Sequence, residues 1–189
     1  KEVISDIDFS HRLCSGEYAH TNDNFKRPSV DLMTNEKSRD EENNRYEIYD
    51  YPGPYGDTGQ GRRIAKVRLE ENLTLRDQAE GKSTCPRMIP GFTFTLAGYD
   101  VSNCNIEYLI VAAVHSGSQP QTLEEHSGPE SGTAYENCFQ VIPSSVSYRP
   151  LREHKKPVVK GMLSAVVVGP QGEEIYTDGH GRLKVQFHW

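Results

Sequence analysis

The apolar residues of this chain favour β-strands along most of its length, and only one segment has the spacing of a helix. From Ile64 to Ala79, β-branched residues are rare, and Leu69 and Leu73 stand one helical turn apart. Gly81 follows where a C-terminal cap belongs. The pattern predicts a mainly β fold with one helix over residues 64–79.

Strand patterns lie on both sides of the predicted helix. Residues 46–51 form an aromatic strand that a Pro-Gly-Pro sequence ends. Residues 92–96 alternate between apolar and threonine side chains, as a half-buried strand does. The apolar run at 108–114 predicts a strand buried on both faces. We expect a long surface loop at 115–134, before an ordered segment that begins at Phe139.

Two charged stretches have no apolar period. Residues 36–47 hold eight charged side chains in twelve positions, which predicts a solvated loop. Residues 149–160 contain two prolines and five basic side chains against one acidic side chain, which predicts an exposed linker. We therefore expect one domain over residues 1–148 and a second over residues 161–189.

The second domain has only strand and turn patterns. Its last strand, residues 183–189, has apolar odd positions and polar even positions. This alternation predicts that Phe187 and Trp189 face a core and that Lys184 faces solvent.

Composition excludes several classes of protein. With 21 basic and 27 acidic side chains the net charge is −6, which argues against a free nucleic-acid binder. The hydrophobic fraction of 35% and a mean hydropathy of −0.69 indicate generous loops or surfaces that a partner covers. No window approaches the roughly 18 apolar residues that span a bilayer. With neither an initiator methionine nor a leader, we expect Lys1 and Trp189 to be internal to a longer protein.

The four cysteines show no metal-binding pattern. They are separated by intervals of 71, 19 and 34 positions, without a C-x-x-C pair or a histidine at zinc-ligand spacing. We predict no metal site and no cofactor. Because the chain is too large to depend on disulfides, we predict four reduced thiols and synthesis in the cytosol. The four residues are Cys14, Cys85, Cys104 and Cys138.

Candidate catalytic residues have simpler explanations. His115 precedes Ser116 and His126 precedes Ser127, but neither serine lies in a G-x-S-x-G elbow. Glu173 and Glu174 are neighbours near a strand, so they point to opposite faces and cannot share a proton. We predict no catalytic residue. Two further histidines, in a turn and on a polar strand face, are interpreted as solvated: His180 and His188.

Glycines and arginines precede the predicted helix. Gly56, Gly59 and Gly61 lack the G-K-[ST] of a phosphate loop and are interpreted as helix-entry turns. Arg62 and Arg63 oppose the helix macrodipole, so a partner and solvent both remain possible for them.

Several motifs in a fixed order resemble the VgrG family, the spike proteins of bacterial type VI secretion systems. The densest match covers residues 161–189. The other matching segments are Tyr49-Asp50-Tyr51-Pro52-Gly53, Arg68-Leu69-Glu70-Glu71, Glu107-Tyr108-Leu109-Ile110-Val111, Phe139-Gln140-Val141-Ile142-Pro143 and Tyr148-Arg149-Pro150. One departure is Leu163-Ser164, where family members usually carry Gln-Thr.

The resemblance implies a structural assembly part that resembles the hub and spike base of contractile phages. It implies a phage-hub-like β-barrel domain with one helix, the tube-capping domain, over residues 1–148. The first strands of an OB-fold would follow over residues 161–189, with the needle and any effector beyond Trp189. The implied partners are two further copies in a homotrimer, the Hcp tube hexamer, the baseplate, and effector or tip proteins. The implied protein is made in the bacterial cytoplasm, assembled at the baseplate and secreted, with transient membrane contact through the needle.

Two alternatives come from other classes. An OB-fold that binds single-stranded nucleic acid or saccharide needs exposed aromatic platforms, and Phe187 and Trp189 are predicted to face the core instead. A hub with a built-in cell-wall hydrolase needs a catalytic domain, which would lie beyond Trp189. We predict a protein that is not an enzyme and binds no nucleic acid.

Overall fold

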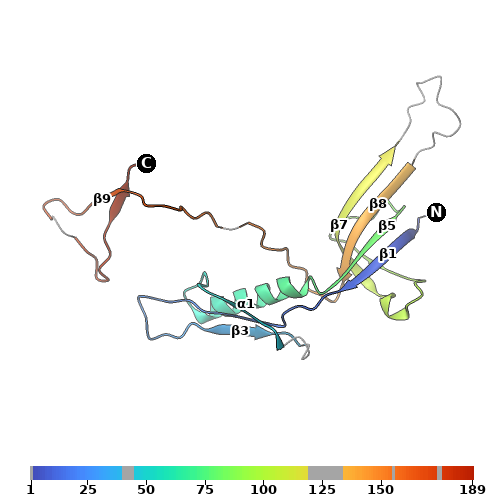
Figure 1. The fold of residues 1–189 in the computed structure, drawn as a ribbon, viewed down its shortest axis with the longest axis horizontal. Helices are drawn as coiled ribbons and strands as arrows, with labels where there is room; N and C mark the ends of the chain where they lie inside the picture. The colour runs from blue at the N-terminus through green and yellow to red at the C-terminus, as the bar shows by residue number, and fades with distance from the viewer. Residues whose placement is uncertain (1, 40–44, 119–133, 155, 174–175) are drawn as a thin grey trace, which may run out of the picture. The chain divides into compact units, whose positions relative to one another are not determined.

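A computed structural model gives the fold of residues 2–39, 45–118, 134–154, 156–173 and 176–189. The chain divides into two compact units, which can be followed by colour in Figure 1. The first unit consists of Lys1–Asp23 and Leu32–Leu151, and the second of Asn24–Asp31 and Arg152–Trp189.

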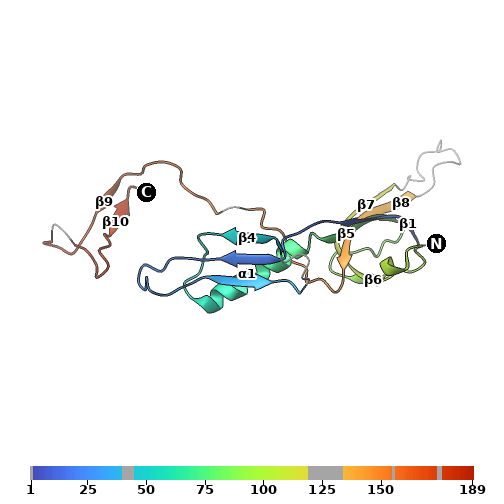
Figure 2. The same cartoon turned by 60° about the horizontal axis from the view of Figure 1, so that its bottom comes forward.

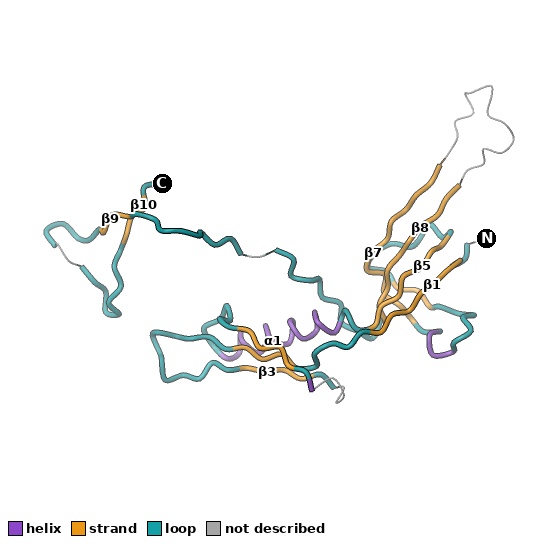
Figure 3. The backbone as a smooth tube through the Cα atoms, in the orientation of Figure 1, coloured by secondary structure: helices purple, strands orange, loops and turns teal. Residues whose placement is uncertain are grey.

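A five-stranded sheet in which every neighbouring pair is antiparallel forms the larger part of the first unit (Figure 3). Its strand order is β1-β5-β8-β7-β6. The pairs β6–β7 and β7–β8 join consecutive strands, whereas β1–β5 and β5–β8 join strands that are not consecutive in the sequence. The strands are β1 (Ile4–His11), β5 (Asp77–Ser83), β6 (Thr93–Thr95), β7 (Glu107–Ser118) and β8 (Ala134–Pro143).

One face of this sheet carries the main apolar core. Ile7 of β1, Ala79 of β5 and Val141 of β8 are buried there, because alternate residues of a strand point to the same face. The pairing of β7 with β8 shifts register between Ile110 and Ala112. The opposite face is polar, with exposed side chains such as Asp8, Glu80 and Gln140.

A separate part of the first unit, which we call the helix–strand part, combines three short strands with the helix (Figure 2). The strands β2 (Glu17–His20) and β3 (Thr34–Lys37) are antiparallel, whereas β2 and β4 (Glu47–Asp50) are parallel. The helix α1 (Thr58–Leu73) packs on β2 and β3. Its residues Ala65 and Leu69 form a small core with Tyr18.

The helix begins and ends earlier than the sequence pattern predicted. Asp57 caps its N-terminus by accepting a hydrogen bond from the Gln60 amide at 2.9 Å. The prediction that the helix continues to residue 79 is wrong, because Asp77–Ser83 is the strand β5, which pairs with β1 and β8. Gly81 is therefore a buried strand residue and not a cap.

The strand predictions have mixed outcomes. The aromatic strand at 46–51 is confirmed as β4. The strand at 92–96 is confirmed in a shorter form, β6. The prediction of a charged loop at 36–47 is wrong at both ends, because β3 pairs with β2 as far as Lys37 and β4 begins at Glu47.

The predicted burial on both faces at 108–114 is not found in β7, because its buried residues lie on one face and Leu109 between them is only partly buried. Tyr108 and Ile110 are buried, but Val114 is 70% exposed. The strand β7 also continues to Ser118, and β8 begins at Ala134, so both strands include residues of the loop predicted at 115–134. The remainder of that loop, 119–133, lies outside the described residues.

The second unit contains a small antiparallel pair, β9 (Ala165–Val167) and β10 (Val185–Phe187). All three residues of β10 are exposed, and Phe187 is 40% exposed. The predicted burial of this strand's odd positions is therefore not found. Two short strands bury an apolar face only when a further element packs on it. The Phe187 ring instead stacks on Trp189, with centroids 4.6 Å apart.

Candidate interaction site

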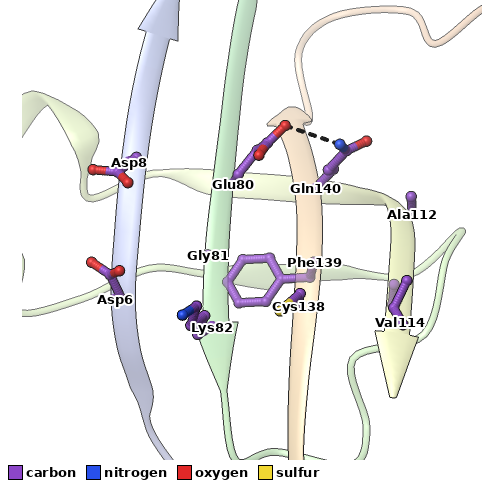
Figure 4. A pocket seen from close by; sticks show the side chains of 11 residues that line it. Asp6, Asp8, Glu80, Gly81, Lys82, Ala112, Val114, Cys138, Phe139 and Gln140 are labelled. Atoms are coloured by element: carbon purple, nitrogen blue, oxygen red, sulfur yellow. Dashed lines mark hydrogen bonds between the residues drawn. The ribbon is translucent and has the colours of Figure 1, made fainter. Parts of the chain in front are cut away.

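The polar face of the five-stranded sheet contains a hollow, which we call the sheet hollow (Figure 4). Asp6 and Asp8 of β1 project from one side of it, and Glu80 and Lys82 of β5 stand on the adjacent strand. These residues share one face because each strand alternates: their neighbours Ile7, Ala79 and Gly81 lie on the core face.

Small side chains keep the sheet hollow open. Ala112 and Val114 come from β7, and Cys138 comes from β8. The hollow has a volume of about 320 Å³. Gln140 lies on its wall and donates a hydrogen bond from Nε2 to Glu80 Oε1 at 2.9 Å. The floor is thus largely apolar and the rim is polar, a combination that suits contact with another protein surface.

The charge of the sheet hollow is predominantly negative. Three carboxylates, Asp6, Asp8 and Glu80, stand against one ammonium group, that of Lys82. Within the described part of the chain, neither Asp6 nor Asp8 has an ion-pair partner, and both are exposed. A cationic surface would find unpaired acceptors here.

A histidine–carboxylate pair near the end of β1 is the group that most resembles a catalytic site. His11 Nδ1 lies 2.5 Å from Asp77 Oδ1, and Arg76 donates from Nε to Asp77 Oδ2 at 2.8 Å. Partial burial acts to raise the pKa of Asp77, but the hydrogen bonds from His11 and Arg76 outweigh it, so the pKa lies below its ordinary value.

The arrangement around His11 does not activate a nucleophile as it stands. His11 shares a hollow with Cys104 and Tyr108, but among the described residues the one hydrogen bond of its imidazole ring is to Asp77. Nucleophilic catalysis needs the base in hydrogen-bond contact with the attacking group. The sequence could not reveal this pair, because its members are 66 positions apart and meet only through the pairing of β1 with β5.

The histidine–serine pairs considered from the sequence are not brought together where the structure describes them. His115 Nδ1 lies 2.5 Å from the Tyr135 hydroxyl group, whereas Ser116 donates to the Glu136 carbonyl at 3.4 Å. Glu173, His180 and His188 are exposed. The second pair, His126 with Ser127, lies outside the described residues, and so does Glu174.

Two of the glycines interpreted as entry turns lie inside the helix. Gly59 and Gly61 belong to α1, and Gly61 is buried. A Cβ atom at Gly61 would stand 2.7 Å from Cε2 of Tyr55, so the glycine allows this ring to approach the helix closely. Arg62 and Arg63, which follow it, are exposed.

The remaining candidates add no further site. All four cysteines are free, and partial burial raises the pKa of Cys14. In the described ranges, no three histidine, cysteine or carboxylate side chains are placed to hold a metal ion. Within the same ranges, no helix has the length and apolar character needed to cross a membrane.

Comparison with known proteins gives consistent results at the level of sequence. Residues 1–121 match the family model described as phage tail baseplate hub (GPD). The type VI secretion system spike protein VgrG3 of Vibrio cholerae is 38% identical over 167 residues, which are 87% of this chain and 16% of that protein. The spike protein VgrG1b of Pseudomonas aeruginosa is 36% identical over 196 residues, covering 100% of this chain and 25% of that protein. The chain thus spans about a quarter or less of these relatives.

A solved structure shows the same fold. The 43 kDa tail protein of prophage MuSo2 from Shewanella oneidensis matches with a TM-score of 0.51 at 12% identity, over 74% of this chain and 40% of that one. The mainly β architecture with one helix is therefore shared with a phage tail protein. The family match covers well over half of the sequence, and the chain belongs to the phage tail baseplate hub (GPD) family.

Proposed function

We propose that the chain is part of the hub and spike base of a type VI secretion system, in which three copies form a ring at the end of a tube of stacked Hcp hexamers. The observation that carries this proposal is the similarity to VgrG spike proteins over 87% and 100% of the chain. The hub description of the matching family supports the same role.

The proposed role is mechanical. β7 and β8 pair at ten positions, and a ladder of this length distributes a load over many hydrogen bonds. No side chain of the chain is proposed to perform chemistry, and neither a cofactor nor nucleic acid is proposed to bind. One relative is named an actin cross-linking toxin, and the chain covers 15% of that protein. We propose that any enzymatic activity of such proteins resides outside the segment that corresponds to this chain.

The proposed organisation has a tube-capping domain over residues 1–148, a linker over 149–160 and the first strands of an OB-fold over 161–189. The protein would be made in the bacterial cytoplasm, assembled at the baseplate and delivered outside the cell. Its further partners would be baseplate proteins and effector or tip proteins, and its needle would touch the target membrane.

Secretion of the tube protein tests the proposal. In the whole protein, with any sequence that adjoins the chain, Val141→Asp places a charge in a position that is 0% exposed and should unfold the sheet. Secretion of the tube protein should then stop. The matched change Val101→Asp, at a position that is 53% exposed, should leave secretion intact. Normal secretion with Val141→Asp, or with the gene deleted, would contradict the proposed role.

A further inference from the structure

The first half of α1 carries a cluster of three cations, Arg62, Arg63 and Lys66, which we call the helix patch. All three side chains are exposed. Arg62 and Lys66 are four positions apart and Arg63 and Lys66 three, so the three side chains gather on one side of the helix. Within the described ranges none of them has an ion-pair or hydrogen-bond partner.

The helix patch is unfavourable for the isolated chain. Like charges four positions apart repel one another along a helix. Cations in the first turns also oppose the positive end of the helix dipole. The first turn of α1 carries no acidic side chain, and the carboxylate of the N-cap Asp57 accepts a hydrogen bond from the Gln60 amide. The three cations therefore gain little from their own helix, and an acidic surface on another molecule would compensate them.

The sheet hollow has the complementary chemistry. Its carboxylates Asp6 and Asp8 are exposed and unpaired among the described residues, and Glu80 is exposed beside them. Its floor presents the exposed side chain of Val114. Arginine and lysine side chains suit such a surface, because their apolar stems cover apolar atoms while their charged ends reach the rim.

We propose that the helix patch of one copy of this chain docks into the sheet hollow of the next copy. The inference rests on the ring of three copies proposed above. A ring with threefold symmetry uses a head-to-tail interface, in which one surface of each copy meets a different surface of its neighbour. The chain offers two such surfaces of opposite charge on separate elements, α1 and the β1-β5 pair.

The charges also exclude the symmetric alternatives. Two helix patches placed together would bring cations against cations, and two sheet hollows would bring carboxylates against carboxylates. Juxtaposed like charges weaken an interface and select against the wrong pairing. The observed distribution favours head-to-tail contact over a twofold dimer.

Charge reversal tests the pairing in the whole protein. The triple variant R62E/R63E/K66E should weaken trimer formation by at least about tenfold, as measured by sedimentation equilibrium. The triple variant D6K/D8K/E80K should weaken it to a similar degree. The chain that carries all six substitutions should form trimers again, because each reversed patch then meets a reversed hollow.

A matched control separates the pairing from a general effect of charge. Reversal of three exposed arginines outside the helix patch, R12E/R39E/R45E, changes the net charge by the same amount and should leave the trimer intact. Circular dichroism should show that every variant is folded. If a triple variant fails to fold, the salt dependence of the native trimer tests the docking instead. The dissociation constant of the trimer should rise at least about tenfold between about 50 mM and about 500 mM salt.

The outcomes distinguish this inference from the proposed function. A native protein that stays monomeric at micromolar concentration contradicts the proposed ring itself. A native trimer that both triple variants preserve, or that salt leaves unchanged, overturns the docking of helix patch into sheet hollow and leaves the ring standing. Loss of the trimer in the two triple variants without recovery in the sixfold variant also overturns the direct pairing.

Discussion

The ring of Phe139 lies against Gly81, its partner on the neighbouring strand. The two residues face each other in the pairing of β5 with β8. A Cβ atom at Gly81 would stand 2.5 Å from Cζ of Phe139 and 2.8 Å from the backbone oxygen of Asp6. The glycine thus leaves the space that this buried ring fills, in the centre of the sheet that carries the sheet hollow.

Gly81→Ala should therefore destabilise the first unit. The added methyl group meets both a ring and a backbone atom, so the free energy of unfolding should fall by about 1–3 kcal/mol, as overpacking does. Denaturant titration of the whole chain measures the change. Gly56→Ala is the control, because a Cβ atom there has no neighbour within 4 Å. In a Phe139→Leu background the smaller side chain should reduce the loss of unfolding free energy that Gly81→Ala causes. An equal loss with Phe139 and with Leu at that position would contradict the contact.

The hydroxyl group of Tyr55 should be important for the stability of the helix–strand part of the first unit. It lies 2.9 Å from the His20 carbonyl oxygen and 2.8 Å from that of Leu32, and all three residues are buried. Tyr55→Phe removes the donor and leaves both acceptors without it, so we expect a loss of about 1–3 kcal/mol of unfolding free energy.

Thermal unfolding followed by circular dichroism measures the effect of Tyr55→Phe. The matched control is Tyr49→Phe, because Tyr49 is 57% exposed, so removal of its hydroxyl group leaves no buried acceptor without a donor. That change should stay within about 0.5 kcal/mol. Similar losses from the two substitutions would show that the buried hydrogen bonds contribute nothing specific.

Replacing Phe187 should have a modest effect in this chain. The ring is 40% exposed and stacks on Trp189 at an interplanar angle of 19°. Phe187→Ala should therefore cost about 0.5–1.5 kcal/mol, the value of an aromatic pair, and not the roughly 3–5 kcal/mol of a buried ring. Trp189 is the one tryptophan of the chain, so its fluorescence reports on the stack directly. Lys184→Ala should leave that fluorescence unchanged, and a loss above about 3 kcal/mol with Phe187→Ala would restore the assignment of the ring to a core.

The turn at Asp178 should titrate at unusually low pH. Its Oδ1 atom accepts hydrogen bonds from the amides of Arg182 at 3.0 Å and His180 at 2.8 Å. These two backbone hydrogen bonds, assisted by the Arg182 side chain, lower the pKa of Asp178 from 3.8 to about 2.

Because the pKa of Asp178 is lower in the folded chain than in the unfolded one, the carboxylate stabilises the turn above pH 3.8, and this contribution is lost as the pH falls towards about 2. An NMR titration of the side-chain carboxyl carbon measures the midpoint. In about 6 M urea the midpoint should return to roughly 3.9. A midpoint near 4 in the folded chain would contradict the hydrogen-bonded turn.

The arrangement of residues around the sheet hollow shows which features of a sheet a sequence pattern can predict and which it cannot. The alternation of polar and apolar residues predicts which positions of a strand share a face, and the buried Val141 beside the exposed Gln140 agrees with it. Alternation does not identify the neighbouring strand. Asp8 and Glu80 are 72 positions apart, and they share a rim only because β1 pairs with β5. The same reason hides the His11–Asp77 pair from any local pattern.

The sequence by itself determined the mainly β character, the presence of one helix, the aromatic strand β4 and, through ordered motifs, the resemblance to hub and spike proteins. These features depend on local periodicity or on residue identity. Tertiary structure decided where the helix ends, because Asp77–Ser83 gains more from pairing with two strands than from continuing a helix. It also decided that Phe187 is exposed, since an apolar side chain is buried only where another element covers it.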